Sequence, residues 1–291
     1  PGNINMVQLA PTVQATHSNY TQVHQGSVPP YMDYFSDRSS SKVLVDSLQS
    51  EQGARFLRKR NRNIIIETSK DVPVLDDYCW LTLGQIHKLF PMDNIVNMDA
   101  RTVLSCIPYA APELEGVQAS DLSQAINKSC AMDPSLLHTG FDNFMAGVFN
   151  SALGVRKGIH DTDTIISWFT KRKLHYDLDV QQIPLKFVKN WYQTDFEIRH
   201  ETDNFFSVIA VSVEAENREV TNWTQPLVKP VDEGIIAFLV KNINGIFHFL
   251  VQAKVEPGNF DVVEMAPTVQ CVTGSYKQVD PDERPPYVEY V

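Results

Sequence analysis

The stretch PGNINMVQLAPTVQATHSNYTQV (residues 1–23) returns as PGNFDVVEMAPTVQCVTGSYKQV (residues 257–279), 256 positions later. Twelve of these 23 positions are identical without a gap, and the same register places PPYMDYF (29–35) over PPYVEYV (285–291). A solenoid needs at least three short, stacked units, so a two-copy repeat with this long spacing predicts two homologous domains instead.

The first copy of this repeat is expected to be incomplete. A strand-rich block, residues 161–256, precedes the second copy and has no counterpart ahead of Pro1. The chain does not begin with Met, and its start has no basic region followed by an apolar run, as a signal peptide would. We therefore expect the C-terminal portion of a longer protein. Its expected domains are the end of the first repeat with a helical extension (1–110), a helical connector (111–160) and the second repeat (161–291).

The composition indicates a globular protein and excludes several classes of partner. The chain has 291 residues, of which 43% are hydrophobic and 10% aromatic, and a net charge of −10. Two domains with their own cores are expected at this length. The negative charge argues against nucleic acid and anionic membranes as partners, and no apolar run is long enough for a membrane span. The four cysteines have no CxxC spacing, which indicates reduced thiols in a cytoplasmic protein.

The apolar pattern predicts an α+β fold of mixed sheets with flanking helices. The run at 41–63 has apolar residues at roughly helical spacing and a serine-rich lead-in, so it is expected to be a helix, and LTLGQIHKLF (81–90) a second one that stops at Pro91. β-branched or alternating apolar runs predict strands, with NING (242–245) as a hairpin turn. The expected strands are NIIIE (63–67), FFSVIAVSVEA (205–215), GIIAFLV (234–240) and FHFLVQAKVE (247–256).

The common catalytic motifs do not occur. There is no GxGxxG, GxxxxGK[ST], GxSxG or HExxH, and the eight histidines have no metal-ligand spacing. Neither a cofactor nor a metal site is therefore expected.

Three polar clusters are candidates for ligand binding. The first is the loop QATHSNY (14–20), whose Thr16, His17, Ser18, Asn19 and Tyr20 follow a strand-like segment. A loop held by a strand can converge its polar groups on a ligand. The alternative is a turn in which Ser18 and Asn19 satisfy their own backbone.

The second cluster is basic, and the third is aromatic. Guanidinium groups bind phosphate bidentately, so a run of cations suggests a diphosphate contact, although a solvated helix face is the alternative. Indoles near polar groups suit a base or sugar face, although a tryptophan in a core is the commoner case. The basic residues are Arg55, Arg58, Lys59, Arg60 and Arg62, and the aromatic set comprises Trp168, Trp191, His200, Trp223 and Gln225.

A series of ordered motifs resembles the NDP-hexose 2,3-dehydratases, which make deoxysugars for natural products. The motifs are VDSLQSEQGARFLRKRNRN (45–63), WLTLGQIHKLF (80–90), NMDARTVLSCIP (97–108), WF at 168–169, IPLKFVKNW (183–191), RHETDNFFSVIAVSVEA (199–215), NREVTNWTQPL (217–227), FHFLVQAKVEPGN (247–259) and the two APTVQ segments. The resemblance implies tandem Nudix-like domains, a homodimer and the substrate dTDP-4-keto-6-deoxyglucose. VEAENREV (213–220) lacks the glutamate spacing of a working Nudix box, so metal-assisted hydrolysis is not expected.

The two copies of the repeat differ in the loop after APTVQ, and this difference guides the choice of site residues. Copy one has the polar loop 16–20, and copy two has Val272, Thr273, Gly274, Ser275 and Tyr276. Dehydration needs an acid and a base but involves no net redox change, so we expect copy one to be catalytic through Tyr20 or His17. The expected substrate-binding residues are Thr16, Ser18, Asn19, Ser50, Arg58, Arg60, Trp168, Arg218, Gly234, Thr273, Ser275 and Tyr276. A nucleotide-sugar-binding domain without turnover is the alternative function.

Overall fold

The computed structural model describes residues 7–16, 28–37, 41–108, 147–148, 151–152, 158–216, 218, 220–271, 276–277 and 279–291. The chain divides into two compact units. Unit 1 comprises residues 1–49, 60–108 and 212–225, and unit 2 comprises residues 50–59, 109–211 and 226–291. Small antiparallel sheets and a few helices make up both, so the fold is mixed α+β, as the sequence predicts. The expected connector 111–160 lies almost entirely outside the described residues.

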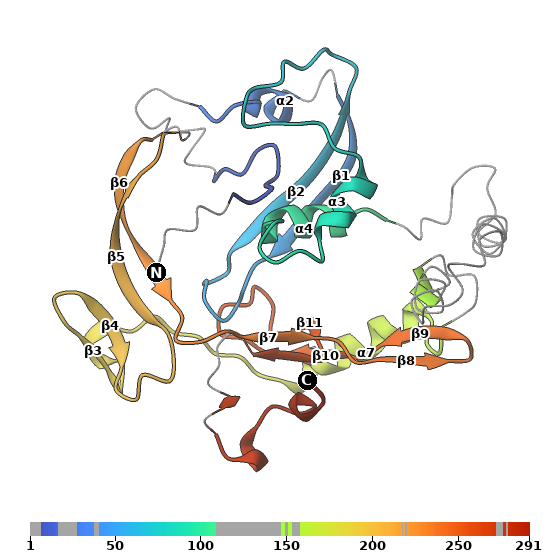
Figure 1. Cartoon of the computed structure of the whole chain (residues 1–291). Coiled ribbons are helices and arrows are strands. Elements are labelled where there is room, and N and C mark those ends of the chain that lie inside the picture. The colour runs from blue at the N-terminus through green and yellow to red at the C-terminus, as the bar shows by residue number, and fades with distance from the viewer. Residues whose placement is uncertain are drawn as a thin grey trace. The chain divides into compact units, whose positions relative to one another are not determined.

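Unit 1 contains a long β-hairpin and three short helices (Figure 1). The hairpin strands are β1 (Ser41–Ser50) and β2 (Arg60–Thr68), and the helices are α2 (Met32–Ser36), α3 (Leu83–Leu89) and α4 (Met98–Ser105). Helix α3 is the helix expected at 81–90. It begins with a capping box, in which the Thr82 hydroxyl accepts from the Gln85 amide and the Gln85 side chain accepts from the Thr82 amide.

The helix expected over 41–63 is wrong, because this segment forms β1, the hairpin tip and the start of β2. Cross-strand ion pairs hold the hairpin, with Arg62 2.7 Å from Asp46 and Lys42 3.8 Å from Glu67. In a helix, Asp46 and Arg62 would lie about 24 Å apart along the axis. The strand expected around 63–67 is confirmed as the central part of β2.

The APTVQ segment of copy one is extended and is held by the start of α4. Leu9 forms a parallel bridge with Val96, in which the Leu9 amide donates to the Ile95 carbonyl (2.7 Å) and the Asn97 amide donates to the Leu9 carbonyl (3.0 Å). Gln14 donates to Asp99 and accepts from Asn97, the N-cap residue of α4. The backbone of Leu9 thus has partners within unit 1.

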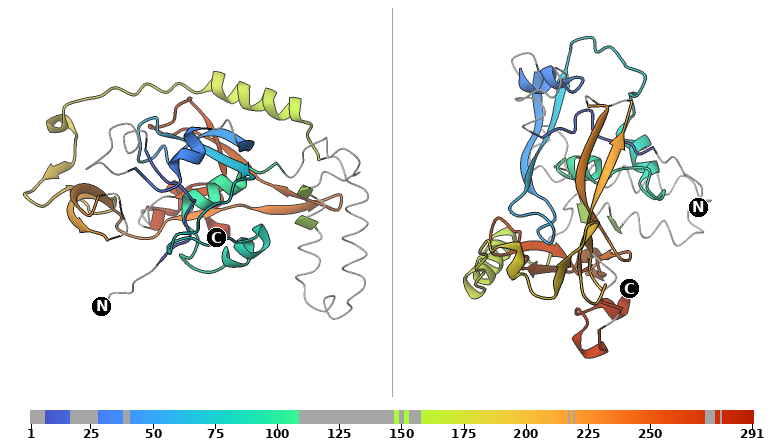
Figure 2. Two further views of the ribbon diagram at one scale, coloured as in Figure 1. Left: turned by 90° about the horizontal axis from the view of Figure 1, so that it is seen from above. Right: turned by 90° about the vertical axis from the view of Figure 1, so that its left-hand side faces the viewer.

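Unit 2 begins with its one long described helix, α7 (Thr162–His175), which leads through an extended segment into the strands (Figure 2). The Asp161 side chain caps this helix. The strands that follow in the chain are β3 (Trp191–Gln193), β4 (Glu197–His200), β5 (Ser207–Glu214), β6 (Asn222–Lys229), β7 (Ile235–Ala237), β8 (Val240–Ile243), β9 (Ile246–Phe249), β10 (Val251–Lys254), β11 (Glu264–Pro267) and β12 (Val269–Cys271). The end of β5 and the first half of β6 belong to unit 1, which contains residues 212–225. They form a four-stranded sheet in the order β3-β4-β5-β6 and the pairs β7–β12, β8–β9 and β10–β11.

The strands expected in this region are confirmed, but two of them are divided. Strand β5 lies within the run 205–215, whereas GIIAFLV splits into β7 and the start of β8, and FHFLVQAKVE splits into β9 and β10. The NING turn joins β8 to β9, and Asn244 and Gly245 both have positive φ (55° and 81°). Positive φ at both central residues is what a type I′ hairpin turn requires.

The threonine of the second APTVQ segment joins the strands around it. The Thr268 side chain is buried, with 5% of the residue exposed. Its hydroxyl accepts from the Leu239 amide (2.9 Å) and donates to the Leu250 carbonyl. Leu239 lies between β7 and β8, and Leu250 lies between β9 and β10. Val263 and Val269, the two bulkiest fully buried residues, lie on either side of it in the sequence. Thr268 therefore satisfies two main-chain groups at the strand interruptions.

Replacing Thr268 by valine, which has nearly the same shape, is expected to lower the free energy of unfolding by about 1 kcal/mol, because the Leu239 amide and the Leu250 carbonyl, both part-buried, lose their partner. Urea unfolding of the variant measures this change. Thr12, the exposed counterpart in copy one, is the matched control, and Thr12→Val should leave the urea midpoint nearly unchanged. Equal effects of the two substitutions would contradict the bridging role of Thr268.

The two Pro-Pro-Tyr segments have the same backbone turn. Tyr31 (φ 61°, ψ 8°) and Tyr287 (φ 67°, ψ 0°) are both left-handed, and a short helical segment follows each. Such a conformation is rare for a non-glycine residue, so its occurrence at two positions 256 apart is informative. Each turn also pairs its tyrosine with the next one along the chain, with ring centroids 6.3 Å apart for Tyr31–Tyr34 and 6.4 Å for Tyr287–Tyr290. This match supports the predicted repeat.

Candidate functional site

The loop that follows APTVQ in copy two begins and ends beside Gly234. At its start, Cys271 of β12 pairs with Ile235 of β7, the residue after Gly234. At its end, the Lys277 ammonium lies 2.6 Å from an Asp232 carboxylate oxygen. Thr273 and Ser275 lie outside the described residues, but both ends of their loop are fixed. The structure thus brings the predicted residues Gly234 and Tyr276 to one place.

The ion pair at the end of this loop keeps both groups charged. The hydrogen bond from Lys277 holds the pKa of Asp232 below its usual value, and the same contact raises the pKa of Lys277. The Lys277 ammonium also lies 6.0 Å from the centroid of the Tyr276 ring. The Lys277 ammonium, paired with Asp232, is therefore fixed next to a half-buried phenol.

A pocket of about 460 Å³ opens beside these residues. Its lining combines two cations with tyrosine and proline side chains. The lining residues are Tyr276, Lys277, Pro281, Arg284, Pro285, Pro286, Tyr287, Val288 and Glu289. Among the predicted site residues, Tyr276 is the one that lines it.

A partly buried lysine on the neighbouring strand was not predicted. The Lys254 ammonium donates to the Gln270 carbonyl (2.7 Å) and lies 3.2 Å from a Glu256 oxygen. Burial raises the pKa of the adjacent Cys271 thiol, and the positive charge of Lys254 opposes this rise. The sequence does contain a signal for this pair. Lys254 and Glu256 are two residues apart in the run 247–256, so their side chains lie on the same side of an extended chain.

The predicted residues Ser50 and Arg58 lie near this lysine's strand, on the tip of the β1–β2 hairpin (50–59). The Ser50 hydroxyl donates to Glu264 (2.7 Å), the cross-strand partner of Lys254. The Arg58 amide donates to the Gly258 carbonyl (2.8 Å), which leaves the exposed guanidinium of Arg58 available for contacts at the surface. The tip thus carries two predicted site residues to the PGN segment (257–259).

The basic cluster expected to bind a diphosphate is divided by the hairpin. Lys59 pairs with Glu51 at 2.7 Å and lies over the Phe56 ring, and Arg62 pairs with Asp46 on the opposite strand. Two of its cations are therefore compensated by carboxylates. The alternative, a solvated helix face, is wrong because no helix forms here, and the diphosphate contact stays a prediction.

The remaining predicted residues lie at other places. Trp168 is half-buried on α7, next to Phe169. Thr16, Arg60 and Arg218 are exposed residues of unit 1. His17, Ser18, Asn19 and Tyr20 lie outside the described residues.

The sequence profile of the family described as NDP-hexose 2,3-dehydratase matches residues 1–107 and 162–291. The chain belongs to this family. Three curated relatives bear the name dTDP-4-dehydro-6-deoxy-α-D-glucopyranose 2,3-dehydratase. They come from Saccharopolyspora spinosa (48% identical over 295 residues), Amycolatopsis orientalis (43% over 291 residues) and Streptomyces violaceoruber (42% over 294 residues).

The matches cover 100% of this chain and 56%, 53% and 58% of the three relatives, respectively. The chain therefore spans about half the length of the dehydratases it matches. The family profile omits 108–161, a range that contains most of the expected connector 111–160.

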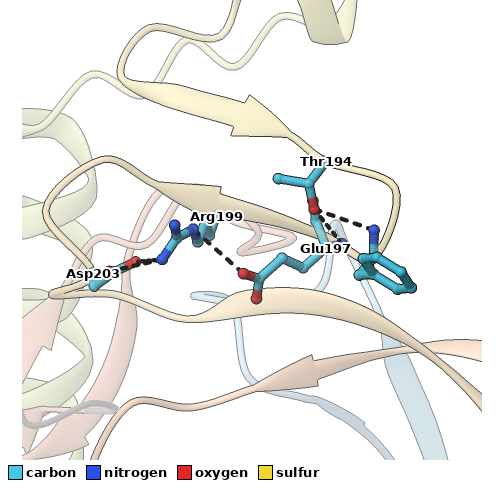
Figure 3. Close-up of polar contacts among 5 residues, drawn as sticks. Thr194, Glu197, Arg199 and Asp203 are labelled. Carbon is cyan, nitrogen blue, oxygen red and sulfur yellow. Dashed lines mark hydrogen bonds and ion pairs between the residues drawn. The ribbon is translucent and has the colours of Figure 1, made fainter.

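A second polar centre of this dehydratase-family chain lies on the β3–β4 hairpin (Figure 3). Arg199 stands between Glu197 (3.3 Å) and Asp203 (2.9 Å), and its guanidinium lies 5.0 Å from the centroid of the Tyr192 ring. The Thr194 hydroxyl accepts from the Phe196 and Glu197 amides and so closes the turn. Because two carboxylates already neutralise Arg199, this centre stabilises the hairpin and is a poor anion site.

The aromatic set contains one close group. Trp191 and His200 are cross-strand partners with ring centroids 5.6 Å apart, and His200 also contacts Phe205 edge-on at 4.8 Å. The Thr202 amide donates to Nδ1 of His200, which places the proton of the neutral ring on Nε2. Trp223 instead donates to Gln225, at 2.6 Å on β6.

Within the described ranges, no three His, Cys, Asp or Glu residues are grouped as a metal site would require. None of the helices in the described part of the chain is long and apolar enough to cross a bilayer. Cys79, Cys106 and Cys271 are free thiols, as predicted, and Cys130 lies outside the described residues.

Proposed function

We propose that these residues form part of a sugar-nucleotide 2,3-dehydratase. Its substrate is dTDP-4-keto-6-deoxyglucose, and its product is the 3,4-diketo-2,6-dideoxy sugar nucleotide of deoxysugar biosynthesis. The observation that carries this proposal is the 42–48% identity, along the whole chain, to three relatives with that activity in their names. We also propose that the protein contains tandem Nudix-like domains, forms a homodimer and is located in the cytoplasm.

The reaction is an elimination that the ketone makes possible. The C3 proton is acidic because it lies next to the C4 carbonyl, so a base removes it and leaves an enolate. The enolate expels the C2 hydroxyl, which an acid protonates to water, and the resulting enol tautomerises to the diketone. The sugar undergoes no net oxidation or reduction, so the reaction balances without a nicotinamide or a flavin.

The protein must supply a base, an acid and hydrogen-bond donors for the C4 oxyanion. A positioned acid or base contributes about 10²–10⁴-fold to the rate, and one oxyanion donor about 10²–10³-fold. We assign the acid or base to Tyr20 or His17, and the donors to Thr16, Ser18 and Asn19 of the same loop. These assignments rest on the greater number of titratable and donor groups in copy one than in copy two.

The copy-two loop is assigned to substrate binding. We assign Gly234, Thr273, Ser275 and Tyr276 to one site, and the position of Cys271 and Lys277 beside Ile235 and Asp232 supports this assignment. Lys277 adds positive charge next to Tyr276, as a diphosphate requires. Ser50 and Arg58 on the hairpin tip and Trp168 on α7 are the further proposed contacts of unit 2, and Arg60 and Arg218 are proposed contacts of unit 1.

Mass spectrometry tests the proposal directly. The chain, and a longer chain of the relatives' length that contains it, are incubated with dTDP-4-keto-6-deoxyglucose, and loss of the mass of one water from the sugar nucleotide is the expected result. Binding of the keto sugar without this loss by both chains would instead support a binding domain without turnover.

Thymidine diphosphate is expected to bind without a divalent cation. The proposed contacts are hydroxyl, amide, ammonium and guanidinium groups, which bind phosphate directly, and the sequence contains no Nudix glutamate box. Isothermal titration calorimetry with EDTA and with added Mg²⁺ should give the same affinity. A strict need for Mg²⁺ would contradict this prediction.

A further inference from the structure

The two Pro-Pro-Tyr turns have one backbone conformation but different surroundings. In unit 1, the segment Pro73–Leu75 lies on the Tyr31 turn, and a turn follows it in which the Tyr78 amide donates to the Leu75 carbonyl (2.9 Å). The Tyr31 hydroxyl donates to the Pro73 carbonyl (2.7 Å) and accepts from the Leu75 amide (3.1 Å). The Tyr78 ring meets the Tyr31 ring edge-on, with centroids 4.7 Å apart. One phenol thus binds a carbonyl and an amide of the same extended segment.

The turn in unit 2 presents the same groups to solvent. Tyr287 is 44% exposed and Tyr290 is 69% exposed, whereas their counterparts Tyr31 and Tyr34 are half-buried. Tyr287 also lines the 460 Å³ pocket, between Pro286 and Val288. An apolar, tyrosine-containing surface of this kind is a candidate interaction site.

The APTVQ segments show the same difference independently. In copy one, the Leu9 amide and carbonyl bond to Ile95 and Asn97, which follow Pro73–Tyr78 in the sequence. The equivalent residue in copy two, Met265, lies on β11, an edge strand of the two-stranded sheet that the structure describes, and is 50% exposed. The Met265 side chain is therefore more exposed than that of Leu9, while the backbone of Met265 pairs with Ala253 of β10.

We propose that the Tyr287 turn docks a proline-led segment built like Pro73–Tyr78, and that the same polypeptide supplies this segment from outside these 291 residues. The relatives contain further residues that could include such a segment, because this chain spans 53–58% of their length. The charges also match, since Asp76 and Asp77 follow Leu75 in the covering segment while Lys277 and Arg284 line the pocket.

The inference concerns the Tyr287 turn, whose pocket also contains Tyr276 and Lys277 of the proposed substrate site, so the docked segment would lie next to that site. Copy one contains both a polar loop at 16–20 and a covered Tyr31 turn, so a docked segment and a substrate loop coexist in one repeat. Peptide binding and sugar turnover are also measured separately, so the failure of one proposal leaves the other standing.

A labelled peptide of residues 70–78 (KDVPVLDDY) serves as the probe, and its fluorescence polarisation is measured as the 291-residue chain is added. Saturable binding that weakens as NaCl is raised is expected, because the peptide is acidic and the pocket is cationic. Tyr287→Phe removes the hydroxyl that would bond to the segment and should weaken binding about tenfold. Tyr290→Phe is the matched control and should bind like the wild type, because the two hydrogen bonds in the covered turn belong to Tyr31.

Three results would overturn the proposal. The first is equal binding of a scrambled peptide, and the second is equal binding by the Tyr287→Phe variant. The third is a photo-crosslink from peptide position 75 to residues 29–34 instead of 276–289. The assignment to the same polypeptide fails separately if a longer chain of the relatives' length binds the peptide as tightly as the 291-residue chain does. In such a chain the segment would already occupy the turn.

Discussion

Replacing Gly258 by alanine is expected to lower the free energy of unfolding by about 3 kcal/mol, at the upper end of what overpacking usually costs. An alanine Cβ at this position would lie 1.9 Å from the Phe56 carbonyl oxygen and 2.4 Å from the Gly53 carbonyl oxygen. Both obstacles are main-chain atoms, so no side-chain rotation can relieve the clash. The hairpin tip must move away, and the hydrogen bonds from Gly258 to Gly53 and from Arg58 to Gly258 are then lost.

The chain offers two matched controls with the same chemical change. In Gly53→Ala the Cβ would meet the Asn259 side-chain oxygen at 2.1 Å, a group that can rotate at some cost, so a smaller loss is expected. In Gly84→Ala the Cβ would meet nothing within 4 Å in the first turn of α3, so the variant should be as stable as the wild type or more stable by up to about 1 kcal/mol. Urea unfolding should rank the three variants in this order, and a Gly258→Ala variant as stable as Gly84→Ala would disprove the close approach.

The elements that sequence patterns predicted well are those whose signal is local. Strand β5 has the β-branched run SVIAVSV, and the NING turn supplies the two residues that best tolerate positive φ. The hairpin at 41–68 was mispredicted because its first strand has leucine and glutamine, which also suit helices, at helix-like spacing. Its strand conformation depends on β2, through partners such as Arg62 for Asp46, and no short window contains both strands.

The internal repeat was the feature of the sequence that guided the choice of candidate site residues. Comparing the two copies identified Tyr276, and the structure places it on a pocket beside the fixed loop ends. Lys254 was missed because its main-chain partner, the Gln270 carbonyl on β12, meets it only when the strands have folded together. Ser50 was selected without knowledge of Glu264, its partner 214 residues later in the chain.

Replacing Tyr20 by phenylalanine is expected to lower kcat about 10²–10⁴-fold if its phenol is the acid or base of the dehydration. Tyr276 is the repeat-equivalent residue, 256 positions later, and Tyr276→Phe is therefore the matched control. Its phenol lies in the copy-two pocket, 6.0 Å from Lys277, in a site assigned to binding. This control variant should raise KM and leave kcat within a few-fold of the wild type, because a binding contact acts on the ground state and the transition state alike.

His17 provides the second half of this test, because copy two has a threonine at the equivalent position and so cannot supply an imidazole. His17→Gln removes the titrating ring but retains hydrogen-bonding capacity. If His17 is the base, the variant should lose kcat as strongly as Tyr20→Phe does, and the acidic limb of the kcat–pH profile should disappear, since the imidazole must be neutral to accept the C3 proton. Steady-state rates and the pH profile are measured on the longest form of the chain that turns over the keto sugar. Catalysis belongs to copy two instead if Tyr276→Phe abolishes turnover while Tyr20→Phe and His17→Gln retain it.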